Sequence, residues 1–162
     1  MSERRLAIGD VFRVSIDDSS VKFFQYIARD SLQLGSHVIR AFVSKYGVTS
    51  IPPCSQIVSD EVEFFAHCFL RIGIRHGYWT FTCLSQYKET VPALFRDTND
   101  YGRQIETSRN WHVWRVGDRG FRHVGRLSGA NINSEIGVVV PPDSIVHRMR
   151  TGTYDFIYPG YQ

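Results

Sequence analysis

The amino-acid sequence predicts an α+β fold, in which a mainly antiparallel, curved β-sheet carries one C-terminal helix. Two observations support this. Along much of the chain apolar residues alternate with polar ones, as they do on strands. Only one segment, near the C-terminus, has the spacing and end residues that are typical of a helix. We therefore expect about seven or eight strands, arranged in a single domain over residues 1–162.

The first three strands are predicted from short alternating segments. Val11–Ile16 and Val21–Ala28 flank the turn-forming residues 17–20, and this arrangement favours a β-hairpin. His37–Val43 is rich in β-branched residues and reads as a third strand.

The longest alternating pattern runs from Glu63 to Ser85. Apolar residues recur at every second position, His76-Gly77 interrupts them, and Trp79 resumes the alternation. A glycine between two alternating segments is typical of a hairpin turn. We therefore expect a second hairpin over residues 63–85.

The second half of the chain is more varied. Thr90 is expected to cap a short helical turn that ends near Leu94, with a polar loop after it. A strand pair is predicted at Trp111–Val116 and Phe121–Gly125, and a covered strand at Ile136–Val140.

The C-terminal helix has clear end signals. Proline at Pro142 and an acid at Asp143 suit a first turn, and Gly152 suits a left-handed end. The aromatic tail at Tyr154–Tyr161 is expected to pack back onto the sheet.

Composition limits the class of protein. The chain has 162 residues, 43% of them hydrophobic, and no tract that approaches the roughly 18 apolar residues of a membrane span. Its N-terminus lacks the apolar core of a signal peptide. Three cysteines, Cys54, Cys68 and Cys83, cannot all pair within one chain. These features predict reduced thiols and a cytoplasmic location.

No metal or cofactor site is predicted. His67 and Cys68 are neighbours on an expected strand and would point to opposite faces. The segment from Asp97 begins like a calcium loop, but Ser108 stands where the bidentate glutamate is required.

Catalytic patterns are also weak, so we predict that the protein is not an enzyme. Cys54 with His67 could form a nucleophile and base, although no local signature accompanies them. His147 with Arg148 and Arg150 could face a phosphodiester, as in a small hydrolase or nuclease. Cations at a helix end are also what the helix dipole predicts, and we favour this second interpretation.

The charge makes a nucleic-acid ligand an alternative rather than the first expectation. The net charge is +3, and the cations are dispersed along the sequence. A single-stranded nucleic-acid-binding module would join basic residues to exposed aromatic rings, for which Trp111 or Trp114 is a candidate.

The N-terminal half resembles the immunity protein 26 family of bacterial polymorphic toxin systems. The resemblance lies in Gly9-Asp10-Val11-Phe12, Phe23-Phe24-Gln25-Tyr26-Ile27 and Val38-Ile39-Arg40-x-Phe42. It implies a cytoplasmic α+β protein that binds and neutralises a cognate toxin and carries no catalytic residues.

We expect the toxin to bind at the polar loop between the second hairpin and the Trp111 strand. Asp97, Asp100, Tyr101 and Arg103 would form the contact, with Tyr101 as the aromatic anchor. The alternative is a loop whose aspartates bind nearby groups of the same chain.

Overall fold

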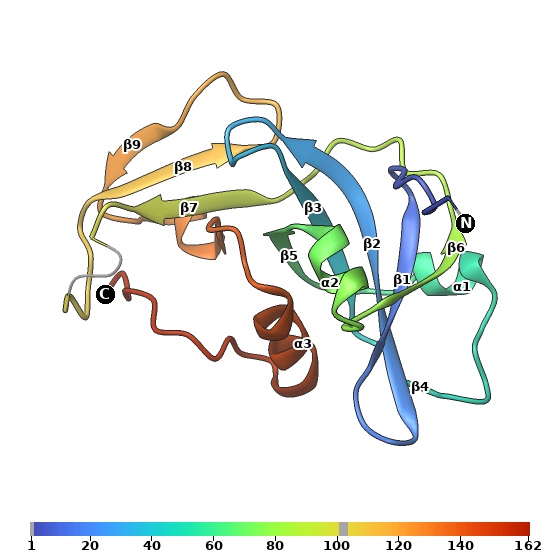
Figure 1. Cartoon of the computed structure of the whole chain (residues 1–162). Coiled ribbons are helices and arrows are strands. Elements are labelled where there is room, and N and C mark those ends of the chain that lie inside the picture. Colours follow the sequence, from blue (N-terminus) through green and yellow to red (C-terminus); the bar gives the residue numbers. More distant parts are fainter. Residues whose placement is uncertain (1, 101–103) are drawn as a thin grey trace.

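The computed structural model describes residues 2–100 and 104–162, which form two β-sheets lying side by side (Figure 1). The larger, sheet A, has the strand order β5-β3-β2-β1-β6, and β4 pairs with β2. The smaller, sheet B, has the order β10-β7-β8-β9. All pairs are antiparallel except β10 with β7. The predicted α+β fold with a curved, mainly antiparallel sheet and a C-terminal helix is confirmed.

The elements have the following bounds. Sheet A consists of β1 (Asp10–Ser15), β2 (Ser20–Asp30), β3 (Ser36–Phe42), β4 (Tyr46–Gly47), β5 (Val62–Cys68) and β6 (Thr80–Leu84). Sheet B consists of β7 (Leu94–Thr98), β8 (Trp111–Arg115), β9 (Arg122–Gly125) and β10 (Glu135–Ile136). The helices are α1 (Cys54–Val58), α2 (Leu70–Arg75) and α3 (Pro142–Thr151), with a 3-10 turn at Gly129–Asn133.

Several predicted elements are confirmed where the sequence signal is local. The β1–β2 hairpin, strand β3, the β8–β9 pair and helix α3 all form. Helix α3 has proline in its first turn and ends at Gly152 with a φ of 89°, the left-handed conformation that glycine favours. The aromatic tail packs back as expected, with Tyr154 and Phe156 against the core.

The predicted hairpin over residues 63–85 is wrong. Strand β5 pairs with β3, strand β6 pairs with β1, and helix α2 lies between them. Residues 70–75 are therefore helical despite their alternating pattern. Packing against the rest of the fold sets the position of this helix. Gly73 allows the Trp79 indole to lie against the helix, because a Cβ there would stand 2.0 Å from Trp79 Cζ2.

Two predictions in the second half of the chain are also wrong. The expected helical turn at residues 90–94 does not form, because residues 90–93 are irregular and lead into strand β7, which also takes in the start of the expected polar loop. The expected strand at residues 136–140 is reduced to the short β10, followed by an isolated bridge between His67 and Val139. In both places pairing with a distant strand decides the conformation.

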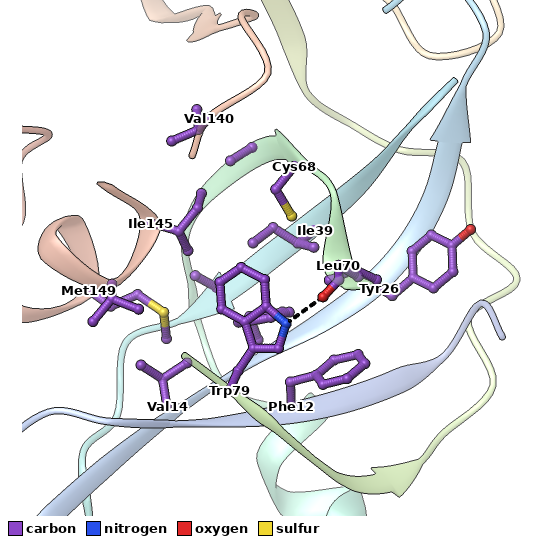
Figure 2. Packing of buried hydrophobic residues seen from close by; sticks show 14 of the residues in the cluster. Phe12, Val14, Tyr26, Ile39, Cys68, Leu70, Trp79, Val140, Ile145 and Met149 are labelled. Carbon is purple, nitrogen blue, oxygen red and sulfur yellow. Dashed lines mark hydrogen bonds between the residues drawn. The ribbon is translucent and has the colours of Figure 1, made fainter. Parts of the chain in front are cut away.

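The main core lies between sheet A and helices α2 and α3 (Figure 2). Trp79 is 1% exposed and packs edge-on against Phe24, with 5.0 Å between ring centroids. Its indole N–H donates to the carbonyl of Leu70 at 3.1 Å, so the polar edge of the ring is satisfied. Ile145 and Met149 of α3 close the same cluster.

The opposite face of sheet A is covered by α1. Ile57 packs there against Phe23 and Phe42. Cys54 of α1 and Cys83 of β6 form a disulfide across this layer. The prediction of three reduced cysteines is therefore wrong, and Cys68 is the buried free thiol. The argument for a cytoplasmic location that rested on unpaired thiols no longer holds.

Among the residues that the structure describes, no helix has the length and apolar character needed to cross a membrane.

The disulfide predicts a measurable contribution to stability. It closes a 29-residue separation, and a crosslink of that length restricts the unfolded chain. Reduction should lower the free energy of unfolding by about 2–4 kcal/mol in urea titrations. A thiol assay on the denatured, unreduced protein should find one thiol per chain.

The matched control is the double variant Cys54→Ser/Cys83→Ser, in which the reductant should leave the unfolding free energy unchanged. Three titratable thiols before reduction would contradict the assignment.

Candidate functional site

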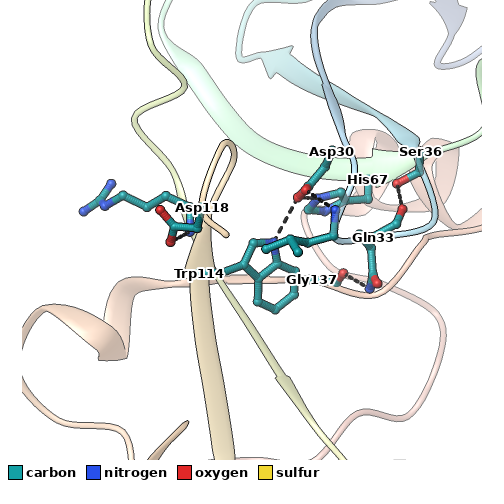
Figure 3. Close-up of polar contacts among 9 residues, drawn as sticks. Asp30, Gln33, Ser36, His67, Trp114, Asp118 and Gly137 are labelled. Atoms are coloured by element: carbon teal, nitrogen blue, oxygen red, sulfur yellow. Dashed lines mark hydrogen bonds and ion pairs between the residues drawn. The ribbon is translucent and has the colours of Figure 1, made fainter. Parts of the chain in front are cut away.

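A buried polar cluster joins the two sheets (Figure 3). Asp30, at the end of β2, accepts hydrogen bonds at Oδ2 from His67 Nε2 at 2.8 Å and from Trp114 Nε1 at 2.9 Å. Its Oδ1 accepts from the backbone N–H of Leu32 at 3.0 Å. The Asp30 and His67 side chains are 1% and 0% exposed. One carboxylate therefore holds β5 of sheet A and β8 of sheet B together.

The environment of Asp30 favours its charged form on balance. Burial acts to raise the pKa of the carboxyl, but the hydrogen bonds from His67, Trp114 and Leu32 outweigh it and hold the pKa below its usual value. The charge is thus stabilised by directed donors at a buried position.

The cluster is enclosed on its remaining sides. The His67 ring packs on Phe95, with 4.3 Å between centroids, and its Nδ1 has no hydrogen-bond partner in the described part of the chain. The pairing of Cys54 with His67 considered from the sequence does not form, because Cys54 is bonded to Cys83. The cluster is buried and positions sheet B against sheet A.

The expected partner-binding loop lies at the far end of β7, and part of it is described. Asp97 is half-buried, and its Oδ1 accepts from the Tyr158 hydroxyl at 3.0 Å. Asp100 Oδ2 accepts from the Ser108 hydroxyl at 2.7 Å. Tyr101 and Arg103 lie outside the described residues. Both aspartates therefore accept bonds from the same chain, as in the alternative considered above.

A pocket of about 200 Å³ lies beside this loop on sheet B. Its lining includes Asp97 of β7, His112 of β8 and Phe121 in the β8–β9 connection. Phe121 is 48% exposed and rests edge-on against Trp114 at 4.7 Å. We name this region the sheet-B pocket. The pocket combines polar groups with the aromatic ring of Phe121, which packing against Trp114 holds in place.

His112 and His123 face each other across β8 and β9, with 4.9 Å between ring centroids. Asp97 stands opposite His112 in the β7–β8 register. Within residues 2–100 and 104–162, no group of three or more ligating side chains is placed to hold a metal ion.

A second and larger cavity, of about 420 Å³, lies between sheet B, the end of α3 and the C-terminal tail. We name it the arginine cavity, after Arg96 of β7 and Arg148 of α3, which both line it. Glu135 of β10 lies there too, and its Oε2 is 3.2 Å from Arg148 Nη1. Burial raises the pKa of Glu135, against the opposing charge of Arg148.

The structure separates the three residues of the considered nuclease site. Arg148 lines the arginine cavity, whereas His147 and Arg150 line a different cavity. The Arg150 guanidinium donates to the carbonyl of Ser15 at 2.9 Å. Adjacent helical positions point in different directions, so the trio does not converge on one reacting atom.

Sequence reasoning did not single out Asp30, Glu135 or Arg96 as site residues. Each is a single charged residue in or beside a strand, and the residues that give it a role come from other elements. A carboxylate at the last position of the long β2 strand was the one available signal.

In comparisons with known proteins, no family model, no curated protein and no solved structure matches this chain.

Replacing Asp30 should destabilise the fold strongly. Asp30→Ala leaves the His67 and Trp114 donors without an acceptor in a buried place, and we expect a loss of about 3 kcal/mol in the free energy of unfolding. Urea denaturation followed by tryptophan fluorescence measures it. The matched control Asp18→Ala, at an exposed turn, should change stability by less than about 0.5 kcal/mol. Equal stabilities of the two variants would contradict the role of Asp30.

The same carboxylate predicts a pH dependence. The pKa of Asp30 is lower in the folded protein than in the unfolded chain. Its contribution to the free energy of unfolding is therefore complete above the unfolded pKa of about 4, and it is lost as the pH falls through the folded pKa. The gap in unfolding free energy between wild type and Asp30→Asn should be constant above about pH 5 and shrink below about pH 4. A gap that widens on acidification would reverse the assigned direction.

Proposed function

We propose that the chain is an immunity-type protein that binds and neutralises a cognate bacterial toxin through the surface of sheet B that contains the sheet-B pocket. The observation that carries the proposal is the sheet-B pocket, which lies directly beside the loop expected to contact the partner. Interfaces commonly centre on a pocket or aromatic anchor surrounded by polar groups. Asp97 and Phe121 supply these two features here.

The scaffold supports such a role. Phe121 rests on Trp114, and Trp114 is tied to sheet A through Asp30. An anchor that is already held in place loses little freedom when a partner binds. The sheet-B pocket therefore suits recognition between preformed surfaces.

The charge of the segment that contains the pocket residues His112 and Phe121 indicates the kind of partner. The segment 109–126 carries five arginines against one aspartate, while the rest of the chain is nearly neutral. All five arginines are exposed: Arg109, Arg115, Arg119, Arg122 and Arg126. A toxin with an acidic surface complements this segment and is steered towards it.

The same arginines favour one second candidate, a single-stranded nucleic acid. Its phosphates would pair with the arginines and one base would stack on Phe121. The dependence on salt separates the two, because counterion release makes nucleic-acid affinity fall steeply with ionic strength.

The disulfide bears on where the protein acts. The resemblance implies the cytoplasm, whereas disulfides persist mainly in oxidising compartments. A cytoplasmic role therefore requires that the fold survive reduction of Cys54 and Cys83.

Truncating the aromatic of the sheet-B pocket tests the proposal. Phe121→Ala should weaken binding to the toxin encoded beside the gene by about 2 kcal/mol, roughly thirtyfold in Kd, because a central aromatic anchor is lost. Titration calorimetry gives the affinity, and a thermal melt shows that the variant folds.

Phe81→Ala is the matched control, since Phe81 is 40% exposed but lies on β6 of sheet A. Its affinity should stay within about twofold of wild type. Equal losses in both variants, or a loss in neither, would place the interface elsewhere. Tight binding of single-stranded DNA that disappears at high salt would favour the second candidate.

A further inference from the structure

The arginine cavity has features of a ligand site that the proposed toxin-binding role does not use. Its volume of about 420 Å³ falls in the range of small-molecule pockets, roughly 300–1,000 Å³. The Arg148 and Glu135 side chains are 19% and 21% exposed, so solvent reaches them. The aromatic residues of the lining are Tyr154, Phe156 and Tyr158.

Glu135 is engaged with one of the two arginines. Its Oε2 pairs with Arg148, and its Oε1 accepts from the Phe65 backbone N–H at 3.5 Å. The Arg148 guanidinium also lies over the rings of Phe64 and Tyr154, at 4.2 and 4.7 Å from their centroids. The carboxylate and the two rings thus hold Arg148 in one position.

Arg96 is the unbalanced charge. It is half-buried, it donates to the backbone carbonyl of Ser134, and it lies 5.7 Å from the ring centroid of Trp111. Among the described residues none of the ion pairs within 4.0 Å includes Arg96, and its buried Nε has no hydrogen-bond partner. Glu135 attracts its charge without pairing directly with it. Burial lowers the pKa of Arg96, which reflects the cost of keeping this cation from water.

The cavity thus holds two guanidinium groups against one carboxylate. The end of α3 would normally repel an anion, since helix C-termini carry partial negative charge. Here two carbonyls near the helix end accept hydrogen bonds, that of Arg148 from the Gly152 N–H and that of Met149 from the cationic Lys22 Nζ. These bonds reduce the negative potential that the helix end presents to the cavity.

We propose that the arginine cavity binds a small organic anion, whose carboxylate or phosphate group pairs with Arg96 and Arg148 and whose apolar body contacts Tyr154 and Phe156. A planar guanidinium matches both oxyanions by paired hydrogen bonds. The Nε of Arg96 gains an acceptor in the complex. Glu135 keeps Arg148 in place and lowers the affinity through its own charge.

The test is a titration of the intact protein with benzoate and, separately, with inorganic phosphate at constant ionic strength, followed by NMR shifts of the cavity residues. Saturable binding of at least one probe is expected. If only benzoate or only phosphate binds, that result identifies whether the site takes a carboxylate or a phosphate group. No saturation with either up to tens of millimolar would overturn the proposal.

A variant of the cavity and a matched control make the test specific. Arg96→Gln should weaken binding at least about tenfold, because a charge-assisted hydrogen bond is lost. Arg75→Gln, which removes the same charge from exposed α2, should change the Kd less than about twofold. An Arg96→Gln affinity equal to that of Arg75→Gln would overturn the assignment.

Glu135→Gln removes the competing charge and should strengthen binding severalfold. This variant keeps the proposal testable if Arg96→Gln fails to fold, and weaker binding in Glu135→Gln would count against it. Binding of the toxin should not change in Arg96→Gln, so failure here is distinguishable from failure of the proposed function.

Discussion

The relation between the two sheets depends on the buried carboxylate of Asp30. Taking an ion out of water costs several kcal/mol, and only well-placed hydrogen bonds recover that energy. His67, Trp114 and the Leu32 N–H provide them from sheet A, from sheet B and from the turn after β2. Apolar contacts between the sheets, such as the cluster that joins Ile27 and Val38 of sheet A to Phe95 of sheet B, give energy but tolerate sliding. The directed bonds to Asp30 set the position of β8, and so the position of the sheet-B pocket.

The elements that the sequence predicts correctly are those whose signals are local. Alternation around a polar turn is enough for the β1–β2 hairpin, and a proline, an acid and a glycine are enough for α3. The failures occur where a distant partner decides. The period-two pattern of residues 70–75 becomes helical because Gly73 receives the ring of Trp79, and no pattern within the segment reports that contact. The disulfide is similar, since three cysteines at any spacing leave the pairing open.

The candidate sites were harder to predict than the fold, for the same reason. Arg96, Glu135 and Arg148 come from β7, β10 and α3, and each alone resembles an ordinary surface charge in the sequence. Only the parallel pairing of β10 with β7 brings Glu135 beside Phe95, one position from Arg96. The expected loop was located from its composition, but its aspartates accept bonds from Tyr158 and Ser108. Composition thus locates a polar segment and does not show which of its groups are already satisfied.

Strand β7 connects the two proposed surfaces. Neighbouring residues of a strand point to opposite faces, so Arg96 lines the arginine cavity while Asp97 lines the sheet-B pocket. Tyr158 links them further, because it lines the cavity and its hydroxyl donates to Asp97 Oδ1. The anion proposed for the cavity contacts Arg96, Arg148, Tyr154 and Phe156, so the bond between Tyr158 and Asp97 lies outside its contacts. The two surfaces therefore share the backbone of β7 but not their ligand contacts, and this is why a substitution at Arg96 is expected to affect the anion without affecting the partner.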